Sequence, residues 1–239
     1  MGEDRRIAVY YAPAPGSALH VFGSRWLGRD AATGVTLPQP VVPGVEPDRL
    51  ARLTAAPRGY GFHATLKPPF RLAAGRTEAE LRTALASFAA SRRPFRVRLG
   101  LRSLGGFLAL MLAEPSSEMQ QLADACVMDL DAFRGPPSEA ERAKRMRVGL
   151  TARQVELLDR WGYPYVLDQF RFHMTLSERL SKADAALLMR ALESLAAEVC
   201  AGPVTVDAVT LFEQPSASAP FTITGRFPFG GGDGLPRSC

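Results

Sequence analysis

Several residue types and sequence features are scarce or absent in this chain of 239 residues. It contains no asparagine, which excludes N-linked glycosylation. Its cysteines, Cys126, Cys200 and Cys239, are too few and too widely spaced for a disulfide framework or a zinc site. Its apolar runs are too short to cross a bilayer, and its N-terminus lacks the basic start and apolar middle of a signal peptide. We therefore expect a cytoplasmic protein without membrane contact.

Motifs for common cofactors are missing as well. Neither G-x-x-x-x-G-K-[S/T] nor G-x-G-x-x-G follows an expected strand, so binding of nucleoside triphosphates or dinucleotides lacks support. The chain has only three histidines, and no cluster of acidic residues accompanies them. We therefore expect neither a catalytic metal nor a cofactor.

The positive charge of the chain permits two explanations. The net charge of +5 comes from 29 Lys and Arg against 24 Asp and Glu, and almost all the cations are arginine. This excess could serve an anionic ligand such as a phosphate or RNA, or it could reflect a coding bias toward arginine. Because the cations are spread along the chain, the charge alone does not indicate a nucleic-acid partner.

The hydrophobic periodicity predicts an α+β fold with mostly antiparallel strands. Turn residues and alternation predict strands at 7–12, 61–67, 94–104, 107–112, 170–176, 204–213 and 221–227. Amphipathic patterns and caps predict helices at 17–27, 46–55, 77–91, 117–133, 138–147, 151–161 and 181–200. We expect one bilobal domain over 1–230, and a flexible glycine-rich tail at 231–239.

Two of the expected strands carry the same short motif. In Gly61–Lys67, the side chains of His63, Thr65 and Lys67 share one face, because strand side chains alternate. The second strand contains His173-Met174-Thr175-Leu176, 110 positions further on (173 − 63). A proline then begins a later strand 31 positions after the first histidine and 30 after the second. This spacing predicts two pseudo-symmetric lobes, with antiparallel sheets that line a cleft and helices on the outside.

Two histidines in matched lobes suit the cleavage of a phosphodiester. One imidazole can accept a proton from the attacking water or hydroxyl, and the other can donate a proton to the leaving oxygen. The hydroxyls of Thr65 and Thr175 can donate hydrogen bonds to the non-bridging phosphate oxygens. One such motif alone would indicate an ordinary half-exposed strand, but two in matched repeats predict a catalytic pair.

The paired His-x-Thr-Leu strands resemble the two-histidine (2H) phosphoesterase superfamily. Longer strings resemble one branch of it, the phosphonate metabolism proteins encoded with carbon–phosphorus lyase genes. These strings are Trp26–Asp30, Tyr60–Phe70, Gly105–Leu110, Trp161–Val166 and Phe170–Leu176. The resemblance implies a bilobal α+β fold, no metal, and catalytic or phosphate-binding roles for His63, Thr65, His173 and Thr175. It also suggests a small phosphorylated substrate, namely a cyclic ribose phosphate such as 5-phosphoribosyl 1,2-cyclic phosphate.

Two other functions remain open at this stage. The protein could process RNA or nucleotide 2′,3′-cyclic phosphates, including RNA ends, or it could bind nucleotides or RNA in the cleft without catalysis. Further candidates for substrate binding are Lys67 and Arg171, which share the strand faces of the histidines, and the aromatic residues Tyr60, Tyr11 and Tyr165. His20 falls within an expected helix, where a structural role is expected.

Overall fold

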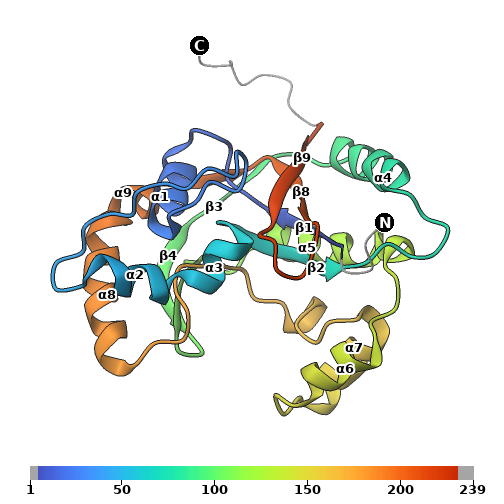
Figure 1. Ribbon diagram of the computed structural model, residues 1–239. Coiled ribbons are helices and arrows are strands. Elements are labelled where there is room, and N and C mark those ends of the chain that lie inside the picture. Colours follow the sequence, from blue (N-terminus) through green and yellow to red (C-terminus); the bar gives the residue numbers. More distant parts are fainter. Residues whose placement is uncertain (1–4, 231–239) are drawn as a thin grey trace.

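The protein is a mixed α+β structure built around one large antiparallel sheet. This computed structural model describes residues 5–230, so the predicted tail at 231–239 lies outside the described residues. Within them, a seven-stranded sheet has the order β4-β5-β6-β2-β1-β8-β9, and β3 pairs with β7 in a separate ribbon (Figure 1). The predicted fold class is therefore confirmed, with the sheets of the two lobes joined where β2 meets β6.

The strands are short, and some differ from their predicted limits. They are β1 Arg6–Tyr11, β2 Ala64–Phe70, β3 Phe95–Val97, β4 Leu99–Leu104, β5 Phe107–Leu112, β6 His173–Thr175, β7 Val204–Val206, β8 Ala208–Gln214 and β9 Thr222–Pro228. The second histidine strand covers only three residues. The first continues through Pro68 and Pro69, where we predicted its end. Prolines are tolerated there because the pairing with β1 is irregular at this point.

The helices begin mostly at the predicted caps. They are α1 Ala18–Leu27, α2 Pro47–Leu53, α3 Ala55–Tyr60, α4 Glu78–Ala90, α5 Ser117–Met128, α6 Glu139–Met146, α7 Ala152–Trp161, α8 Lys182–Leu195 and α9 Ala197–Ala201, with short 3₁₀ turns η1 Asp131–Phe133 and η2 Leu167–Gln169. Thr77 and Glu80 form the predicted capping box of α4. Two predicted helices are interrupted: α5 stops before η1, and α8 is separated from α9 at Ala196.

The order of elements repeats once along the chain. If α2, α3, α6, α7, α9 and the two 3₁₀ turns are set aside as additions, residues 6–104 run β1, α1, β2, α4, β3, β4, and residues 107–214 run β5, α5, β6, α8, β7, β8. The order of the large sheet is symmetric about the β2–β6 contact, with β5 matching β1 and β4 matching β8. Each repeat thus begins one strand earlier than the sequence spacing indicated, and β9 is an addition at one edge. This symmetry places the two histidine motifs on adjacent strands at the centre.

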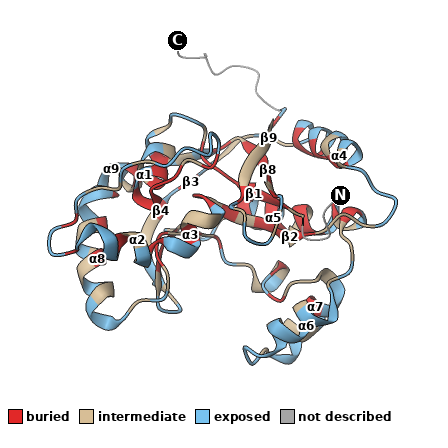
Figure 2. Ribbon diagram, viewed as in Figure 1, coloured by how far each residue is buried: buried red, intermediate tan, exposed pale blue. Residues whose placement is uncertain are grey.

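The two faces of the large sheet have different surroundings. On one face, alternate strand residues such as Val9, Leu66 and Met174 are buried in the main core against α1, α4, α5 and α8. On the other face, a small cluster around Tyr10, Phe212 and Phe221 packs beside His63. Figure 2 shows that buried residues concentrate in the central strands and in the helix faces that touch them. The open part of the second face is available for a functional site.

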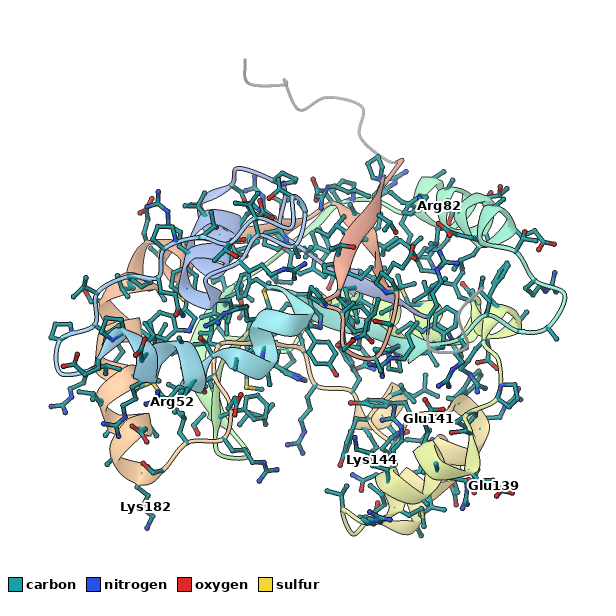
Figure 3. All side chains as sticks on the ribbon, viewed as in Figure 1. Arg52, Arg82, Glu139, Glu141, Lys144 and Lys182 are labelled. Carbon is teal, nitrogen blue, oxygen red and sulfur yellow. The ribbon has the colours of Figure 1, made fainter. Side chains whose placement is uncertain are left out.

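A helical extension between α5 and β6 lies apart from the main body. Helices α6 and α7 lie at the lower right in Figure 1, and α6 has no buried residue. In Figure 3, Glu141 lies on the side of α6 that faces the sheet, and its carboxylate pairs with Arg71 at 2.8 Å. Arg142 of α6 pairs with Asp159 of α7 at 2.8 Å. Ion pairs rather than apolar burial therefore hold α6 in place.

Candidate active site

The two His-x-Thr motifs lie side by side on one face of the sheet. Ala64 of β2 pairs with Met174 of β6 in an antiparallel ladder. The register therefore places His63 opposite Thr175, and Thr65 opposite His173. Because neighbours alternate, Ala64 and Met174 point into the core, where both are 0% exposed, and the four motif side chains point the other way. Diagonal neighbours in such a ladder lie ~7–8 Å apart, which leaves room for one phosphate between the imidazoles.

Both histidines are held in the same orientation by their own backbone. The Nδ1 of His63 lies 2.9 Å from the carbonyl of Gly61, and the Nδ1 of His173 lies 2.7 Å from the carbonyl of Arg171. A carbonyl only accepts hydrogen bonds, so Nδ1 carries the proton in each neutral ring. The Nε2 of His63 lies 3.2 Å from the hydroxyl of Thr65, which donates to it when Nδ1 carries the ring proton. In each ring Nε2 is therefore the atom that can act as a base or, when protonated, as an acid.

Gly61 is required by the bend that presents His63. It ends α3 with a φ of 78°, a backbone conformation that favours glycine. A Cβ there would also lie 2.5 Å from the Cβ of Ala31. The resulting turn directs the carbonyl of residue 61 onto the imidazole two positions later.

Burial shifts the titration of both rings. Burial lowers the pKa of His63 from 6.5 to about 4, the carbonyl of Gly61 opposes this shift, and a charge on His173 adds to it. Burial also lowers the pKa of His173, against the effect of the carbonyl of Arg171. A positive charge on His173 therefore disfavours the protonated form of His63. A single shared proton would leave one ring as acid and the other as base.

Aromatic side chains surround His63. The ring of Tyr10 stacks on the imidazole, with centroids 3.8 Å apart and an interplanar angle of 19°. Phe212 and Tyr60 lie within 5.8 and 6.1 Å of the same ring, and Tyr60 stacks on Phe221 at 5.2 Å. These contacts fix the plane of His63, and they explain the loss of hydration that lowers its pKa.

His173 borders an open cavity instead. A cavity of about 420 Å³ is bounded by Thr65 and His173, together with Leu66, Pro68, Leu104, Gly105, Phe107, Gln154, Tyr163, Tyr165, Val166, Gln169, Phe170, Arg171 and Arg179. Phe107 lies 5.8 Å from the imidazole, tilted at 52°. Much of the cavity wall comes from the segment between α7 and β6. The cavity is large enough for a small organic substrate.

The predicted orientation of Lys67 is wrong. The pairing with β1 shifts register between Thr65 and Lys67, so Thr65 lies opposite Tyr10 and Lys67 lies opposite Val9, which points into the main core. Lys67 is 1% exposed, and its Nζ donates a hydrogen bond to the carbonyl of Val127 and lies 3.5 Å from Asp131. Burial lowers its pKa to about 8. This irregularity reverses the strict alternation on which the prediction rested.

The other predicted contacts fall in different places. Tyr11 is 1% exposed and packs in the main core near Phe172, so its side chain points away from the site. Tyr60 is 39% exposed and lies beside His63. Arg171 and Tyr165 line the cavity on the His173 side. His20 lies 3.3 Å from Asp30, in keeping with a structural role.

Three residues at the site escaped the sequence argument: Tyr10, Phe107 and Arg179. Tyr10 belongs to a strand whose pairing partner was unknown, so its alternation could not be related to that of His63. Phe107 follows the Gly105-Gly106 turn, and the hairpin pattern gave no indication that β5 would lie beside β6. Arg179 lies outside any regular element, where periodicity makes no prediction.

The described part of the chain contains neither a metal-ligand cluster nor a membrane-spanning helix. Among residues 5–230, no group of three or more His, Cys, Asp or Glu side chains is placed to hold a metal ion. Over the same residues, no helix has the length and apolar character needed to cross a bilayer.

The fold and site define a class: an antiparallel α+β protein with paired His-x-Thr strands, the arrangement expected of the two-histidine phosphoesterases. Comparison with known families gives a match over residues 65–222, more than half of the chain, to the family described as "Protein of unknown function (DUF1045)". The chain belongs to this family. This family match, together with the names of the relatives below, confirms the predicted membership of the phosphonate metabolism branch.

Two curated relatives share sequence with nearly the whole chain. A protein of Janthinobacterium sp. (strain Marseille) is 42% identical over 95% of the chain, and one of Laribacter hongkongensis is 37% identical over 91%. Both are named ribose 1,5-bisphosphate phosphokinase PhnN. The chain spans about half the length of these relatives, 51% and 50% respectively.

Solved structures show a weaker likeness. The Escherichia coli protein LigT in complex with 3′-AMP is 17% identical, with a TM-score of 0.41, and covers 95% of this chain and 99% of its own. A conserved protein of unknown function from Agrobacterium tumefaciens is 15% identical, with a TM-score of 0.44, and covers 94% and 86%. Matches at this level say nothing of substrate or mechanism.

Proposed function

We propose that the protein is a metal-independent cyclic phosphodiesterase that opens a cyclic ribose phosphate with His63 and His173 as acid and base. The observation that carries this proposal is the placement of the two motifs. The ladder register makes the two histidines diagonal neighbours, and in each ring Nδ1 donates to a backbone carbonyl, which leaves Nε2 for proton transfer. Proton transfer in both directions at one phosphate needs this geometry.

The chemistry balances with water as the only co-reactant. One neutral imidazole accepts a proton from water as the water oxygen forms a bond to phosphorus. The bond from phosphorus to the leaving sugar oxygen breaks, and the protonated imidazole donates its proton to that oxygen. The register places Thr65 opposite His173 and Thr175 opposite His63, and the Thr65 hydroxyl lies 3.2 Å from Nε2 of His63. When substrate binds, both hydroxyls can donate to the non-bridging oxygens. The rings finish with their protons exchanged, and solvent restores them.

The name of the two relatives supports a ribose substrate. Hydrolysis of 5-phosphoribosyl 1,2-cyclic phosphate at the bond to O2 yields ribose 1,5-bisphosphate, the compound in that name. The relatives are about twice as long as this chain, which has no G-x-x-x-x-G-K-[S/T] motif. We infer that the half of the relatives outside the match supplies the kinase. Such a fusion would join two consecutive reactions, with the product of this domain as the substrate of the kinase.

A second candidate is processing of 2′,3′-cyclic phosphates on nucleotides or RNA. The aromatic side chains around the site favour it, because Tyr60 and Tyr165 are 39% and 42% exposed and could stack on a base. A non-catalytic nucleotide binder would use the same surfaces without turnover.

One assay separates these possibilities. The purified protein would be incubated with 5-phosphoribosyl 1,2-cyclic phosphate and, separately, with 2′,3′-cyclic AMP in ¹⁸O-labelled water, and the products followed by ³¹P NMR. The proposal predicts ribose 1,5-bisphosphate with the label in the phosphate at C1. Preferred turnover of the cyclic nucleotide would support the second candidate, and no turnover of either compound would contradict both enzymatic assignments.

A further inference from the structure

The cavity beside His173 contains two cations that the two-histidine chemistry does not use. Arg171 and Arg179 both line it and are both exposed. Neither guanidinium has an ion-pair or hydrogen-bond partner among residues 5–230. Many other arginines of the described chain pair with acids, as Arg71 does with Glu141 and Arg226 does with Asp207. Arg171 and Arg179 differ from these paired arginines, because each leaves an uncompensated positive charge in the wall of the cavity.

The surroundings leave this positive charge unopposed. Of the described residues that bound the cavity, none is acidic. The carboxylate of the adjacent Glu178 is engaged elsewhere, because it accepts a hydrogen bond from the backbone N–H of Ala56 at 3.0 Å. A cavity walled by low-dielectric aromatic side chains strengthens the field of such cations toward an anion inside it.

The backbone that carries Arg179 is fixed on both sides. The N–H of Glu178 donates to the carbonyl of Leu53, and the N–H of Leu180 donates to the carbonyl of Gly106, each at 2.8 Å. Arg171 is likewise fixed at its carbonyl, which accepts the hydrogen bond from His173. Both arginines thus extend from anchored positions on either side of β6, so the cost of ordering them around a ligand falls mainly on the side chains.

We propose that Arg171 and Arg179 form a second anion site that binds a phosphate monoester at the far end of the substrate, while the His-x-Thr pair holds the cyclic phosphate. This inference rests on the proposed function and specifies the substrate of the enzyme: a sugar that carries both a cyclic phosphate and a terminal phosphate. The ligand class follows from the guanidinium fork, which matches phosphate oxygens in a bidentate manner. The cavity of about 420 Å³ also extends well beyond a single phosphate.

The kinetic test compares two substrates that differ only in the terminal phosphate: 5-phosphoribosyl 1,2-cyclic phosphate and ribose 1,2-cyclic phosphate. For Arg179→Gln we expect KM for the phosphorylated substrate to rise about tenfold or more, the value of a charge-assisted contact. The constants for the unphosphorylated substrate should change by less than about twofold. Arg171→Gln should act in the same direction. Arg93→Gln, an exposed arginine outside the cavity, is the matched control and should match wild type on both.

A binding experiment separates failure of this inference from failure of the proposed function. Ribose 5-phosphate would be titrated calorimetrically into wild type, Arg179→Gln and Arg93→Gln. Weaker binding to Arg179→Gln alone supports the anion site, even if wild type hydrolyses neither cyclic phosphate and the proposed function fails. Equal binding to all three proteins would overturn the inference, as would equal preference of wild type and Arg179→Gln for the phosphorylated substrate.

Discussion

The two histidine motifs share a backbone plan but differ in their surroundings. In each, Nδ1 is bound to the carbonyl two residues earlier, and the threonine two residues later lies on the same face. Yet Tyr10 stacks on His63, whereas the register places Ala109 at the matching position opposite Thr175. No aromatic ring therefore stacks on the second motif from this position, and His173 instead borders the cavity. The comparison suggests a division of labour in which the His63 side is prearranged and the His173 side admits the substrate.

The largest effect is expected from removing either imidazole. His63→Ala and His173→Ala should each lower turnover of the true substrate by roughly a hundredfold or more, the range for losing a general acid or base. Neither imidazole belongs to a hydrophobic core cluster, so the variants should remain folded. Circular dichroism and steady-state kinetics would check both points. Near-full activity of either variant would show that the two motifs do not act as a catalytic pair.

The next effect tests the stacked side of the comparison. Tyr10→Ala removes a fully buried ring and should lower the free energy of unfolding by about 3 kcal/mol or more, as in other losses of large aromatic side chains. It should also lower kcat, because the plane of His63 is no longer fixed. Tyr10→Phe keeps the ring and should retain most of the stability. Urea unfolding and kinetics on both variants provide the measurement, and full activity of Tyr10→Ala would show that the stack has no role in positioning.

A smaller effect follows from the titration of the two rings. The pKa of His63 is about 4 in the folded chain and 6.5 in its ordinary state. Between these pH values the unfolded chain therefore binds a proton at His63 that the folded chain does not bind. The contribution of the neutral ring to stability is therefore complete above pH 6.5 and is lost as the pH falls toward 4. His63→Gln should remove more of this pH dependence than His173→Gln, since only His63 lies beneath Tyr10. Urea unfolding at pH 7.5 and 5.0 measures it, and identical pH dependence in wild type and His63→Gln would contradict the account.

The smallest effect is expected from chelation. If both sides of the site work through imidazoles and hydroxyls alone, dialysis against EDTA should leave the rate unchanged within error. Assays before and after dialysis, with divalent metals added back, provide the check. A loss of activity that added metal restores would replace the two-histidine mechanism with a metal-assisted one.

Much of this arrangement was predictable from local patterns. The alternation around each His-x-Thr placed histidine and threonine on one strand face, because strand periodicity is local. Residue types also predicted several caps, such as Ser17 for α1 and Thr77 for α4. What joins β2 to β6, by contrast, is a pairing between strands more than a hundred residues apart, and no local pattern encodes it.

The failed predictions have the same origin. Lys67 was assigned to the wrong face because a shift in the β1–β2 register reverses the alternation after Thr65. Tyr11 was assigned to the substrate, but its face of β1 is covered by the helices, and the neighbouring Tyr10 lies at the site. The repeat was placed one strand late because β1 and β5 carry no shared motif. Each error concerns which segment lies beside which, a property of the whole fold.

The central claim is that His63 and His173 act on one phosphate, and imidazole NMR tests it most directly. The chain has only three histidines, so a ¹⁵N-labelled sample yields three ring systems, and His20, paired with Asp30, is the internal control. On titration with inorganic phosphate, the Nε2 signals of His63 and His173 should shift with a common dissociation constant, and the pKa of both rings should rise because the anion favours the protonated form. The His20 signals should stay in place. If only one of the two rings responds, or if they respond with different dissociation constants, the two histidines do not share a phosphate.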